Sequence, residues 1–425
     1  MRIAYLIGHY PAVTHTFIQR EIHELRRQGF EIDTFSIWRA RQDQLLAGVD
    51  RAEHARTYPL LPPRSGDYLR CHIRSALGSP RRYVQTLTRA LRLSTHGLRG
   101  RLLGLSWFLE AVVVQRICER RGIRHVHVHL DGTAPAVGLL VTHLGNGGSE
   151  PGPWSFSMTV HGSKEFFDVA RQRLARKVRA ARFVVCVSDF TRSQLMALVD
   201  DTHWPKLHVV HCGIDPEHFA PPEEGPARDG LIRILTIGRL DNMKGVPILV
   251  EAVAELRRRG APVALTVVGD GPQREHLQRN AVRDSVGEHI TWTGTVGQDG
   301  IRAHYHAAHL FCLPSFAEGI PVVLMEAMST GLPVVANQIT GIPELVEHEV
   351  SGLLLRPGRR DLLVHALERL VRDPDLRARM GGAGREKVVR EFQSRSVGLQ
   401  LGELFTKELS PSTAQPSATS VAARR

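Results

Sequence analysis

Arg239 and Lys244 have the residue types and spacing to bind a phosphorylated ligand. They lie five residues apart in the segment GRLDNMKG, between a strand-like apolar run and a predicted helix that begins near Val246. Ligands of open α/β sheets bind at the carboxyl ends of strands. A guanidinium and an ammonium there can neutralise a diphosphate and stabilise it as a leaving group. Two unrelated surface cations beside a loop are the alternative interpretation.

Glu318 and Glu326 flank a second candidate binding segment, SFAEGIPVVLMEA, at residues 315–327. A strand-like run precedes it, and a helix is expected to begin near Pro321, a residue suited to a first helical turn. Gly319 allows close approach of a ligand to the backbone, and the N–H groups at the helix start form an anion site. One carboxylate can accept hydrogen bonds from a sugar and the other from a ribose. A helix-start carboxylate and a polar residue beside the core are the alternative.

Short apolar runs alternate with helical patterns along the chain, which predicts doubly wound α/β domains with parallel sheets. In the first helical pattern, Thr16 and Gln19 suggest a capping box and Gly29 suggests the stop. The expected strands are 3–7, 32–37, 126–130, 157–160, 183–187, 207–210, 232–237, 264–268, 290–293, 310–313 and 334–336.

The pattern divides the chain into two α/β halves around a segment rich in Pro, Gly and charge. We expect the later C-terminal helix to pack back on the first half and the Ser/Thr/Pro/Ala-rich tail to be disordered. The predicted parts are an N-terminal domain (1–215) with a helical insertion at about 64–120, a linker (216–230), a C-terminal domain (231–385), a helix (386–409) and a tail (410–425).

The insertion carries most of the net positive charge. The chain of 425 residues has a net charge of +12, and residues 64–124 contain 13 Arg and no Lys against three acidic residues. Apolar residues such as Leu69, Ile73, Leu77, Leu91 and Leu102 are interleaved with the arginines. A basic amphipathic region suits an anionic membrane surface, although a solvated face is an equally good interpretation. No nucleic-acid fold signature accompanies the charge, so nucleic acid is not expected as a partner.

The cysteine pattern and the hydropathy predict a cytoplasmic protein. Five widely spaced cysteines without a C-x-x-C motif favour reduced thiols over a disulfide framework. No run of about 18 apolar residues suggests a membrane span. The apolar start is too short for a signal peptide and instead predicts a first strand.

Histidine clusters offer weaker metal candidates. His125, His127 and His129 alternate along a predicted strand, so three imidazoles could converge on zinc, but a plain strand is the preferred interpretation. His306 and His309 have i, i+3 spacing on a predicted helix, which also holds His304. No carboxylate or cysteine completes a site there. We expect no metal site.

Several motifs together resemble those of one known family. The run EGIPVVLMEAM is similar to the E-x7-E signature of retaining GT-B glycosyltransferases of family 4. GRLDNMKG resembles the family's G-R-L-x-x-x-K-G, and VVGDGP resembles its hydrophobic-G-x-G-P turn. GIPELV and SGLLL resemble its G-G-I-P-E and N-G-x-L segments, and SDFTR and CGID resemble its S-x-x-x-R and N-G-V-D. The resemblance spans roughly residues 1–400 and is stronger in the C-terminal half.

This resemblance implies a GT-B fold, with two Rossmann-like domains facing a central cleft, and a metal-independent reaction without a cofactor. It implies that Arg239 and Lys244 bind the donor diphosphate, that Glu318 contacts the transferred sugar and that Glu326 contacts the ribose. His161, in TVHG, matches the family's histidine near the anomeric centre; taken alone, a histidine at a strand end is more often structural. The helix-start residues implied in donor binding are Gly319, Ile320, Pro321 and Val322.

The N-terminus resembles one group within the family. HYPAVTHTFIQREI is similar to the F-P-x-x-S-E-T-F-I-x-x-E-I start of exopolysaccharide and colanic-acid-type transferases. Here Thr14, His15 and Thr16 stand where Ser-Glu-Thr is usual. Gly8 is the candidate for the glycine that approaches the phosphate in some members. The expected N-domain loop contacts are Gly8, His15 and Thr16.

These observations predict a retaining glycosyltransferase that transfers a sugar from a nucleotide-sugar, UDP-linked in preference to GDP-linked. The expected acceptor is a saccharide or a lipid-linked saccharide in exopolysaccharide or cell-envelope glycan synthesis. We expect the protein to work in the cytoplasm and to contact the inner face of the membrane. The alternatives are a nucleotide-sugar epimerase and a non-catalytic binding subunit of a polysaccharide-synthesis complex.

Overall fold

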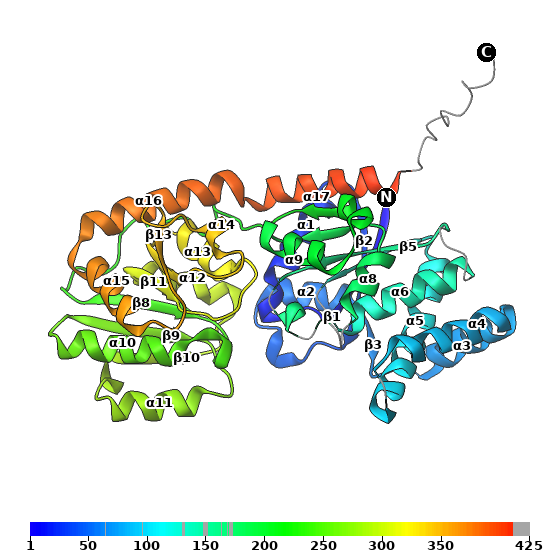
Figure 1. The fold of residues 1–425 in the computed structure, drawn as a ribbon, viewed down its shortest axis with the longest axis horizontal. Helices are drawn as coiled ribbons and strands as arrows, with labels where there is room; N and C mark the ends of the chain where they lie inside the picture. The colour runs from blue at the N-terminus through cyan, green and yellow to red at the C-terminus, as the bar shows by residue number, and fades with distance from the viewer. Residues whose placement is uncertain are drawn as a thin grey trace, which may run out of the picture.

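The computed structural model describes residues 1–63, 65–95, 97–129, 132–147, 152–162, 164–167, 169 and 173–410. Two α/β domains lie next to each other, and two long C-terminal helices run along both (Figure 1). The predicted disordered tail lies outside the described residues except for Ser410. The expected ends of one strand (Leu130) and of the insertion (Arg64) also lie outside them.

The N-terminal domain is built on a seven-stranded parallel sheet with the order β3-β2-β1-β4-β5-β6-β7. The order reverses between β1 and β4, so the loops after these strands open at a switch point, where open α/β sheets bind ligands. β3 was not expected; it is a short edge strand that contains Pro59. The strands are β1 (Arg2–His9), β2 (Glu31–Trp38), β3 (Tyr58–Leu61), β4 (His125–His129), β5 (Ser155–Val160), β6 (Val184–Cys186) and β7 (Leu207–Val209).

Helices cover both faces of this sheet. One face packs in a large apolar cluster with α5, α6 and α8, and the other packs with α1 and the last helix of the chain, α17. The helices are α1 (Thr16–Arg27), α2 (Gly48–Arg56), α3 (Ser65–Gly78), α4 (Pro80–Leu93), α5 (Leu98–Arg120), α6 (Thr133–Asn146), α8 (Leu174–Ala180) and α9 (Asp189–Leu198).

The predicted capping box at the start of α1 is wrong. Thr16 is the first helical residue, and His15 occupies the N-cap without a side-chain capping bond. The Gln19 amide instead donates to Asp50 Oδ1 at 2.8 Å, in the loop-and-helix segment that follows β2. The Gln19 side chain therefore bonds to Asp50, which is distant in the sequence, instead of capping the helix start as the local pattern predicted.

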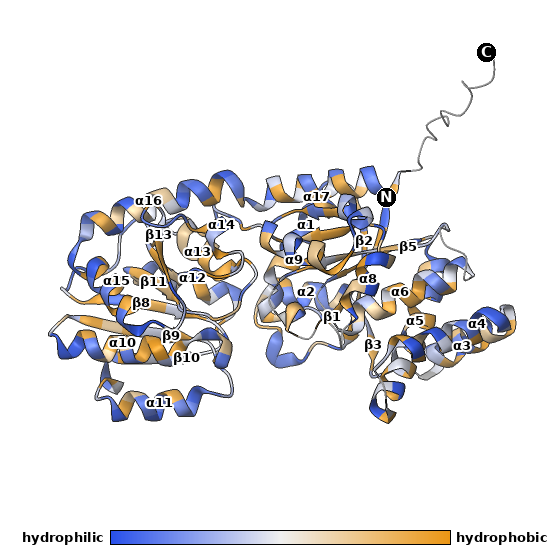
Figure 2. Ribbon diagram, viewed as in Figure 1, coloured by the Kyte–Doolittle hydropathy of each residue, from blue (hydrophilic) through white to orange (hydrophobic). Residues whose placement is uncertain are grey.

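The Arg-rich insertion forms α3, α4 and the first half of α5, at the end of the molecule farthest from the C-terminal domain (Figure 1). Polar and apolar stretches alternate along these helices (Figure 2). Within the described residues, no helix has both the length and the apolar character that a membrane crossing requires.

The C-terminal domain has a six-stranded parallel sheet with the order β10-β9-β8-β11-β12-β13 and a switch point between β8 and β11. β13, which was not expected, is a four-residue strand at the edge. The strands are β8 (Ile232–Ile237), β9 (Val263–Val268), β10 (Ile290–Gly294), β11 (Leu310–Leu313), β12 (Val334–Asn337) and β13 (Gly352–Leu355).

The connection between the domains is packed rather than free. Ile214 and Phe219, which lies within the expected linker, are buried in a C-terminal core cluster. After α16 the chain returns, and α17 joins the N-terminal core through side chains that include Val397 and Phe405. The helices are α10 (Val246–Arg258), α11 (Arg274–Arg283), α12 (Gln298–Ala307), α13 (Val322–Ser329), α14 (Ile342–Leu345), α15 (Arg360–Arg372), α16 (Pro374–Glu391) and α17 (Ser394–Leu409).

Candidate active site

The loop after β8 holds Arg239 and Lys244 at the carboxyl end of the strand. Asp241 shapes the loop, because its side chain accepts a hydrogen bond from the Met243 backbone N–H at 3.0 Å. Gly245 has φ +64° and precedes α10; a Cβ atom there would lie 2.1 Å from the Pro314 carbonyl oxygen. The glycine therefore lets this loop pack against the loop after β11.

Lys244 and Glu318 meet where these two loops touch. Lys244 Nζ lies 2.5 Å from Glu318 Oε1, and both side chains are largely buried. Arg239 is 62% exposed, with its Nε 3.8 Å from Asp241 Oδ2. Arg239 is thus the more accessible of the two cations, and a ligand anion could compete with Glu318 for Lys244.

Glu326 lies on α13, which begins at Val322 with Pro321 at the N-cap. Its Oε1 accepts from Arg20 Nη2 at 3.0 Å, and its Oε2 accepts from the Tyr305 hydroxyl at 2.9 Å. Burial and the neighbouring carboxylate raise the pKa of Tyr305 well above its usual value, so this hydroxyl stays protonated and donates. Arg20 comes from α1, so a residue of the N-terminal domain reaches the carboxylate expected to bind ribose.

The loop that carries Glu318 is held by Asn337, at the end of β12. The Asn337 amide donates to the carbonyl oxygens of Pro314 and Ser315, both at 2.9 Å. The Phe316 N–H donates to the Met243 carbonyl oxygen at 2.7 Å and joins the two loops. These bonds fix the backbone from which Glu318 projects.

His161 follows β5 and lies against this loop from the N-terminal side. A Cβ atom on Gly319 would lie 1.9 Å from the His161 carbonyl oxygen, so only glycine permits the observed approach. The His161 N–H donates to Glu165 Oε1 at 3.0 Å, and its ring Nε2 lies 3.3 Å from His129 Nδ1. Burial lowers the pKa of His161 well below its usual value, and the imidazole is therefore neutral.

The N-terminal loop residues lie near His161 to different degrees. His15 Nδ1 lies 2.8 Å from the His9 carbonyl oxygen, and burial lowers the pKa of His15 to about 4. Its ring contacts Phe17, whose ring centroid is 4.8 Å from that of His161. Thr16 begins α1. Gly8 lies in β1, with nothing described within 4 Å of a Cβ atom added there.

A further interdomain contact joins the segments GIPELV and SDFTR. Glu344, in GIPELV, accepts from the backbone N–H groups of Asp189 and Phe190 at 2.8 and 2.9 Å. These groups open α9, in SDFTR, where a helix N-terminus favours a carboxylate. Contacts across the two domains therefore involve Arg20, Gly319 and Glu344.

Sequence reasoning did not single out Arg20, Tyr305, Asn337 or Glu344. Arg20 lies in the motif FIQREI, and this motif was the only sequence feature that could have indicated its role. No local sequence motif marks Tyr305 or Asn337. The expectation that His309 lies on the same helix as His306 is wrong, because α12 ends at Ala307, and the two rings have different partners. His306 Nε2 lies near the Ala220 carbonyl oxygen, and His309 Nδ1 accepts from the Arg233 N–H.

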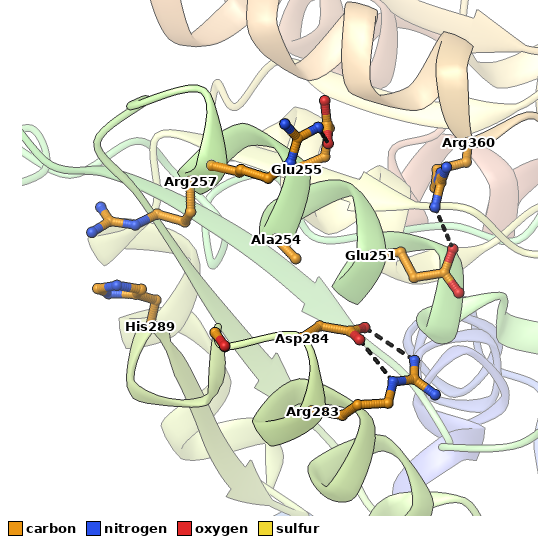
Figure 3. Close-up of a pocket in the computed structure, with 10 residues that line it drawn as sticks. Glu251, Ala254, Glu255, Arg257, Arg283, Asp284, His289 and Arg360 are labelled. Atoms are coloured by element: carbon orange, nitrogen blue, oxygen red, sulfur yellow. Dashed lines mark hydrogen bonds and ion pairs between the residues drawn. The ribbon is translucent and has the colours of Figure 1, made fainter.

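A surface groove of about 700 Å³ lies away from this site, over α10 and the end of α11 (Figure 3). Its charged side chains pair with one another, as in Arg360–Glu251 at 3.4 Å and Arg283–Asp284 at 2.8 Å. None of the predicted site residues lines it. The groove is therefore separate from the site built by the β8 and β11 loops.

Comparison with known proteins agrees with this arrangement. Residues 221–387, which include both loops, match the family described as "Glycosyl transferases group 1". Over 255 residues the chain is 33% identical to a GDP-mannose-dependent alpha-(1-6)-phosphatidylinositol monomannoside mannosyltransferase of Mycolicibacterium smegmatis. That alignment covers 56% of this chain and 65% of the relative, so it spans slightly less than two thirds of the relative's length.

A second relative aligns along nearly the whole chain. WcaL of Escherichia coli K12, named as a candidate colanic acid biosynthesis glycosyltransferase, is 25% identical over 95% of this chain and 99% of its own length. The structure of HepE from Anabaena in complex with UDP-glucose superposes with a TM-score of 0.71 at 18% identity, covering 96% of this chain and 100% of HepE. The predicted GT-B architecture is confirmed, and the C-terminal domain matches the glycosyltransferase group 1 family.

Proposed function

We propose that this protein is a retaining glycosyltransferase that transfers a sugar from a nucleotide-sugar to a saccharide or lipid-linked acceptor. One observation carries the proposal. Lys244 of the β8 loop and Glu318 of the β11 loop meet at a sheet switch point, and the backbone of His161 from the other domain lies directly against Gly319 of the same β11 loop. The family match of residues 221–387 and the alignment with WcaL support the same activity and a role in exopolysaccharide or cell-envelope glycan synthesis.

In this proposal, the C-terminal domain binds the donor and the N-terminal domain binds the acceptor. Arg239 and Lys244 neutralise the diphosphate and stabilise it as it leaves. The wall of the donor site at the start of α13 consists of Gly319, Ile320, Pro321 and Val322. Glu318 binds the transferred sugar, Glu326 binds the ribose hydroxyls, and His161 lies beside the anomeric centre.

Contact between the domains would exclude water, which would otherwise hydrolyse the donor. Retention of the anomeric configuration follows from departure and attack on the same face of the sugar. The anomeric configuration of the product, read from its NMR coupling constant, distinguishes retention from inversion.

The donor class is open between two nucleotides. The mycobacterial relative is named for GDP-mannose, and HepE was solved with UDP-glucose. We favour a UDP-sugar, with a GDP-sugar next, and no metal or cofactor. Melting temperatures measured with UDP, GDP, ADP and their sugars identify the class, since a ligand at 100 times its Kd stabilises a protein by about 2.7 kcal/mol.

The same measurement on Glu326→Ala tests the site. The nucleotide series that stabilises the wild type should stabilise this variant much less. Glu275→Ala, which removes an 86% exposed carboxylate from α11, is the matched control and should respond like the wild type. If no nucleotide stabilises the wild type, the proposal fails. Conversion of the donor without an acceptor would indicate an epimerase instead.

We also propose that the insertion contacts an anionic membrane on its cytoplasmic face, where a lipid-linked acceptor would be presented. Two of its helices, α3 and α5, each show an exposed apolar stripe at helical spacing. On α3 the side chains Leu69, Ile73 and Leu77 are 62, 47 and 78% exposed, and on α5 the stripe begins with Leu98 and Leu102 at 74 and 58%. Exposed apolar patches of this kind mark binding surfaces.

Exposed arginines lie on all three helices of the insertion. Arg70, Arg74, Arg81, Arg82, Arg92, Arg99 and Arg101 are all exposed. Leucines that enter the headgroup region and arginines that pair with lipid phosphates are the two parts of an interfacial membrane site. This surface supports the membrane proposal more strongly than the charge count does.

A further inference from the structure

A row of buried histidines lies along β4, below the candidate active site. β4 and β5 are parallel and in register, with His125 opposite Ser155 and His127 opposite Ser157. The two ring nitrogens of His125 lie 2.9 and 2.8 Å from the hydroxyls of Ser155 and Ser157. Those of His127 lie 2.7 and 2.9 Å from the hydroxyls of Ser157 and Thr159. Both rings are thus held by the neighbouring strand.

His129, the last residue of the row, has different partners. Its Nε2 lies 2.9 Å from Glu21 Oε1, and its Nδ1 lies 3.3 Å from His161 Nε2. Glu21 is on α1, next to Arg20, and its Oε1 also accepts from the Tyr5 hydroxyl at 2.7 Å. The His129 side chain is fully buried. A continuous hydrogen-bonded chain therefore runs from Glu21 through His129 to His161.

The proton positions in this chain follow from chemistry. An ionised carboxylate only accepts hydrogen bonds, so Nε2 of His129 carries a proton. With this single proton on the ring, Nδ1 of His129 is an acceptor, and the proton of neutral His161 lies on Nε2 and points to it. The lone pair of His161 is left on Nδ1, which lies 4.0 Å from Cys212 Sγ.

We propose that Glu21 is a positioning residue, which acts through His129 to set the tautomer and ring orientation of His161. A histidine is commonly oriented by the hydrogen bond of its second nitrogen to a carboxylate. The consequence for catalysis rests on the proposed glycosyl transfer, whereas the tautomer of His161 can be tested without it. Glu21 is the fifth residue of the motif FIQREI, and orienting His161 through His129 would be its role there.

A metal site is the competing use of the same residues. The ligand atoms of Glu21, His127 and His129 lie within 4.8 Å of one another. Both nitrogens of His127 already face hydroxyls of β5, so a metal ion would have to break a short hydrogen bond to gain one ligand. The hydrogen-bonded chain accounts for every nitrogen without an ion.

The test uses the full-length protein labelled with ¹⁵N at histidine. Long-range ¹H–¹⁵N spectra report the tautomer of each neutral imidazole, and His161→Gln identifies the His161 signals. We expect His161 to carry its proton on Nε2 in the wild type and to become a mixture of tautomers in Glu21→Ala. His129→Phe, which keeps a ring of similar size without nitrogen, should give the same mixture. Tyr5→Phe removes a bond to the same carboxylate and should leave the tautomer unchanged.

Steady-state kinetics provide a second test of the role of Glu21. They use the donor that the thermal stabilisation measurements identify. Because a misplaced group costs about 10² in rate, kcat should fall on the order of 10- to 100-fold in Glu21→Ala. The KM for the donor should change less than about threefold. Glu21→Gln keeps an acceptor for His129 and should restore part of kcat.

Three results would overturn the inference. They are a proton on Nδ1 of His161 in the wild type, an unchanged tautomer in both folded variants, and a stoichiometric metal ion in the purified protein. If the wild type transfers no sugar, the proposed function fails, but the tautomer measurement still decides the role of Glu21. If Glu21→Ala does not fold, the tautomer and kinetic measurements are made on His129→Phe and Glu21→Gln instead.

Discussion

Arg20 and Glu326 form an ion pair across the two domains, although they lie 306 positions apart in the chain. Arg20 Nη2 lies 3.0 Å from Glu326 Oε1, and the guanidinium also lies over the Phe219 ring, 5.5 Å from its centroid. Arg20 Nη1 is buried without a partner among the described residues. The carboxylate expected to bind ribose is therefore already occupied by an arginine of the other domain.

We expect Arg20→Ala to destabilise the free protein and to increase the stabilisation that nucleotide gives. Removing one partner of a buried ion pair costs about 3 kcal/mol, because the remaining charge stays buried. Ribose hydroxyls would then satisfy Glu326 without displacing a cation. The measurement is the shift in Tm with saturating nucleotide, compared with Arg20→Lys, which keeps the charge. An equal or smaller shift in Arg20→Ala would show that Arg20 does not compete with ribose.

Gly319→Ala should abolish most of the activity while the protein stays folded. The new Cβ atom would meet the His161 backbone carbonyl oxygen, so the two domains must move apart. A displacement of this size at the reacting centre costs about 100-fold in rate. Gly382→Ala on α16 is the control, since nothing described lies within 4 Å of its added Cβ atom. Full activity in Gly319→Ala would contradict the assigned approach of the domains.

Thr340→Gly should stabilise the protein. Thr340 stands where the resembled G-G-I-P-E motif has its first glycine, and its φ is +46°. The left-handed region costs a residue with a Cβ atom about 1–2 kcal/mol, and glycine loses about 0.5–1 kcal/mol in chain entropy, so the net gain is up to about 1.5 kcal/mol. Urea unfolding measures the difference. Ser285→Gly, at φ +55°, is the matched variant away from the site. A loss of stability in Thr340→Gly would show that the Thr340 backbone is not strained.

Glu110 should make the stability of the insertion depend on pH. It is buried on α5, where Ser106 donates to one oxygen and the other has no described partner. Burial raises its pKa to about 7 from the ordinary value of 4.5. The unfolded chain therefore releases this proton first, and stability falls by about 3 kcal/mol as pH rises from about 4.5 to 7, then levels off.

Glu110→Gln removes this titration. The free energy of unfolding of the variant relative to the wild type should rise between pH 4.5 and 7 and stay constant above 7. Urea unfolding at pH 4.5, 6 and 8 measures the difference. A difference that is independent of pH would mean that Glu110 is ionised in the folded protein.

Leu77→Ser combined with Leu98→Ser should weaken flotation with anionic liposomes. Each leucine that enters the interface contributes about 1.5–3 kcal/mol, so the double variant should lose at least about 100-fold in partition. Val282→Ser removes a residue that is 73% exposed on the C-terminal domain and should have no effect. Equal flotation of all three proteins, or no preference of the wild type for anionic lipid, would refute the membrane surface.

The donor-binding loops could be predicted because the residues that define each loop lie close together in the sequence. A strand, a turn and a helix follow one another within about ten residues at Arg239–Lys244 and at Glu318–Glu326, and parallel sheets bring consecutive strand ends to one edge. The same reasoning failed for β3 and β13, whose short runs give little periodicity. It failed at Gln19, whose side chain has a tertiary partner that no local pattern reveals, and at His309, which lies beyond the end of α12.

The sequence by itself determined the two α/β domains, the loops that carry the cations and carboxylates, and the basic character of the insertion. These properties depend on residue order within single elements. Only the tertiary structure decided that Arg20 reaches Glu326, that Glu21 and His129 reach His161, and that the leucines of the insertion face outward. Such contacts join residues between 32 and 306 positions apart, and they form only when strands and helices distant in the sequence have packed together.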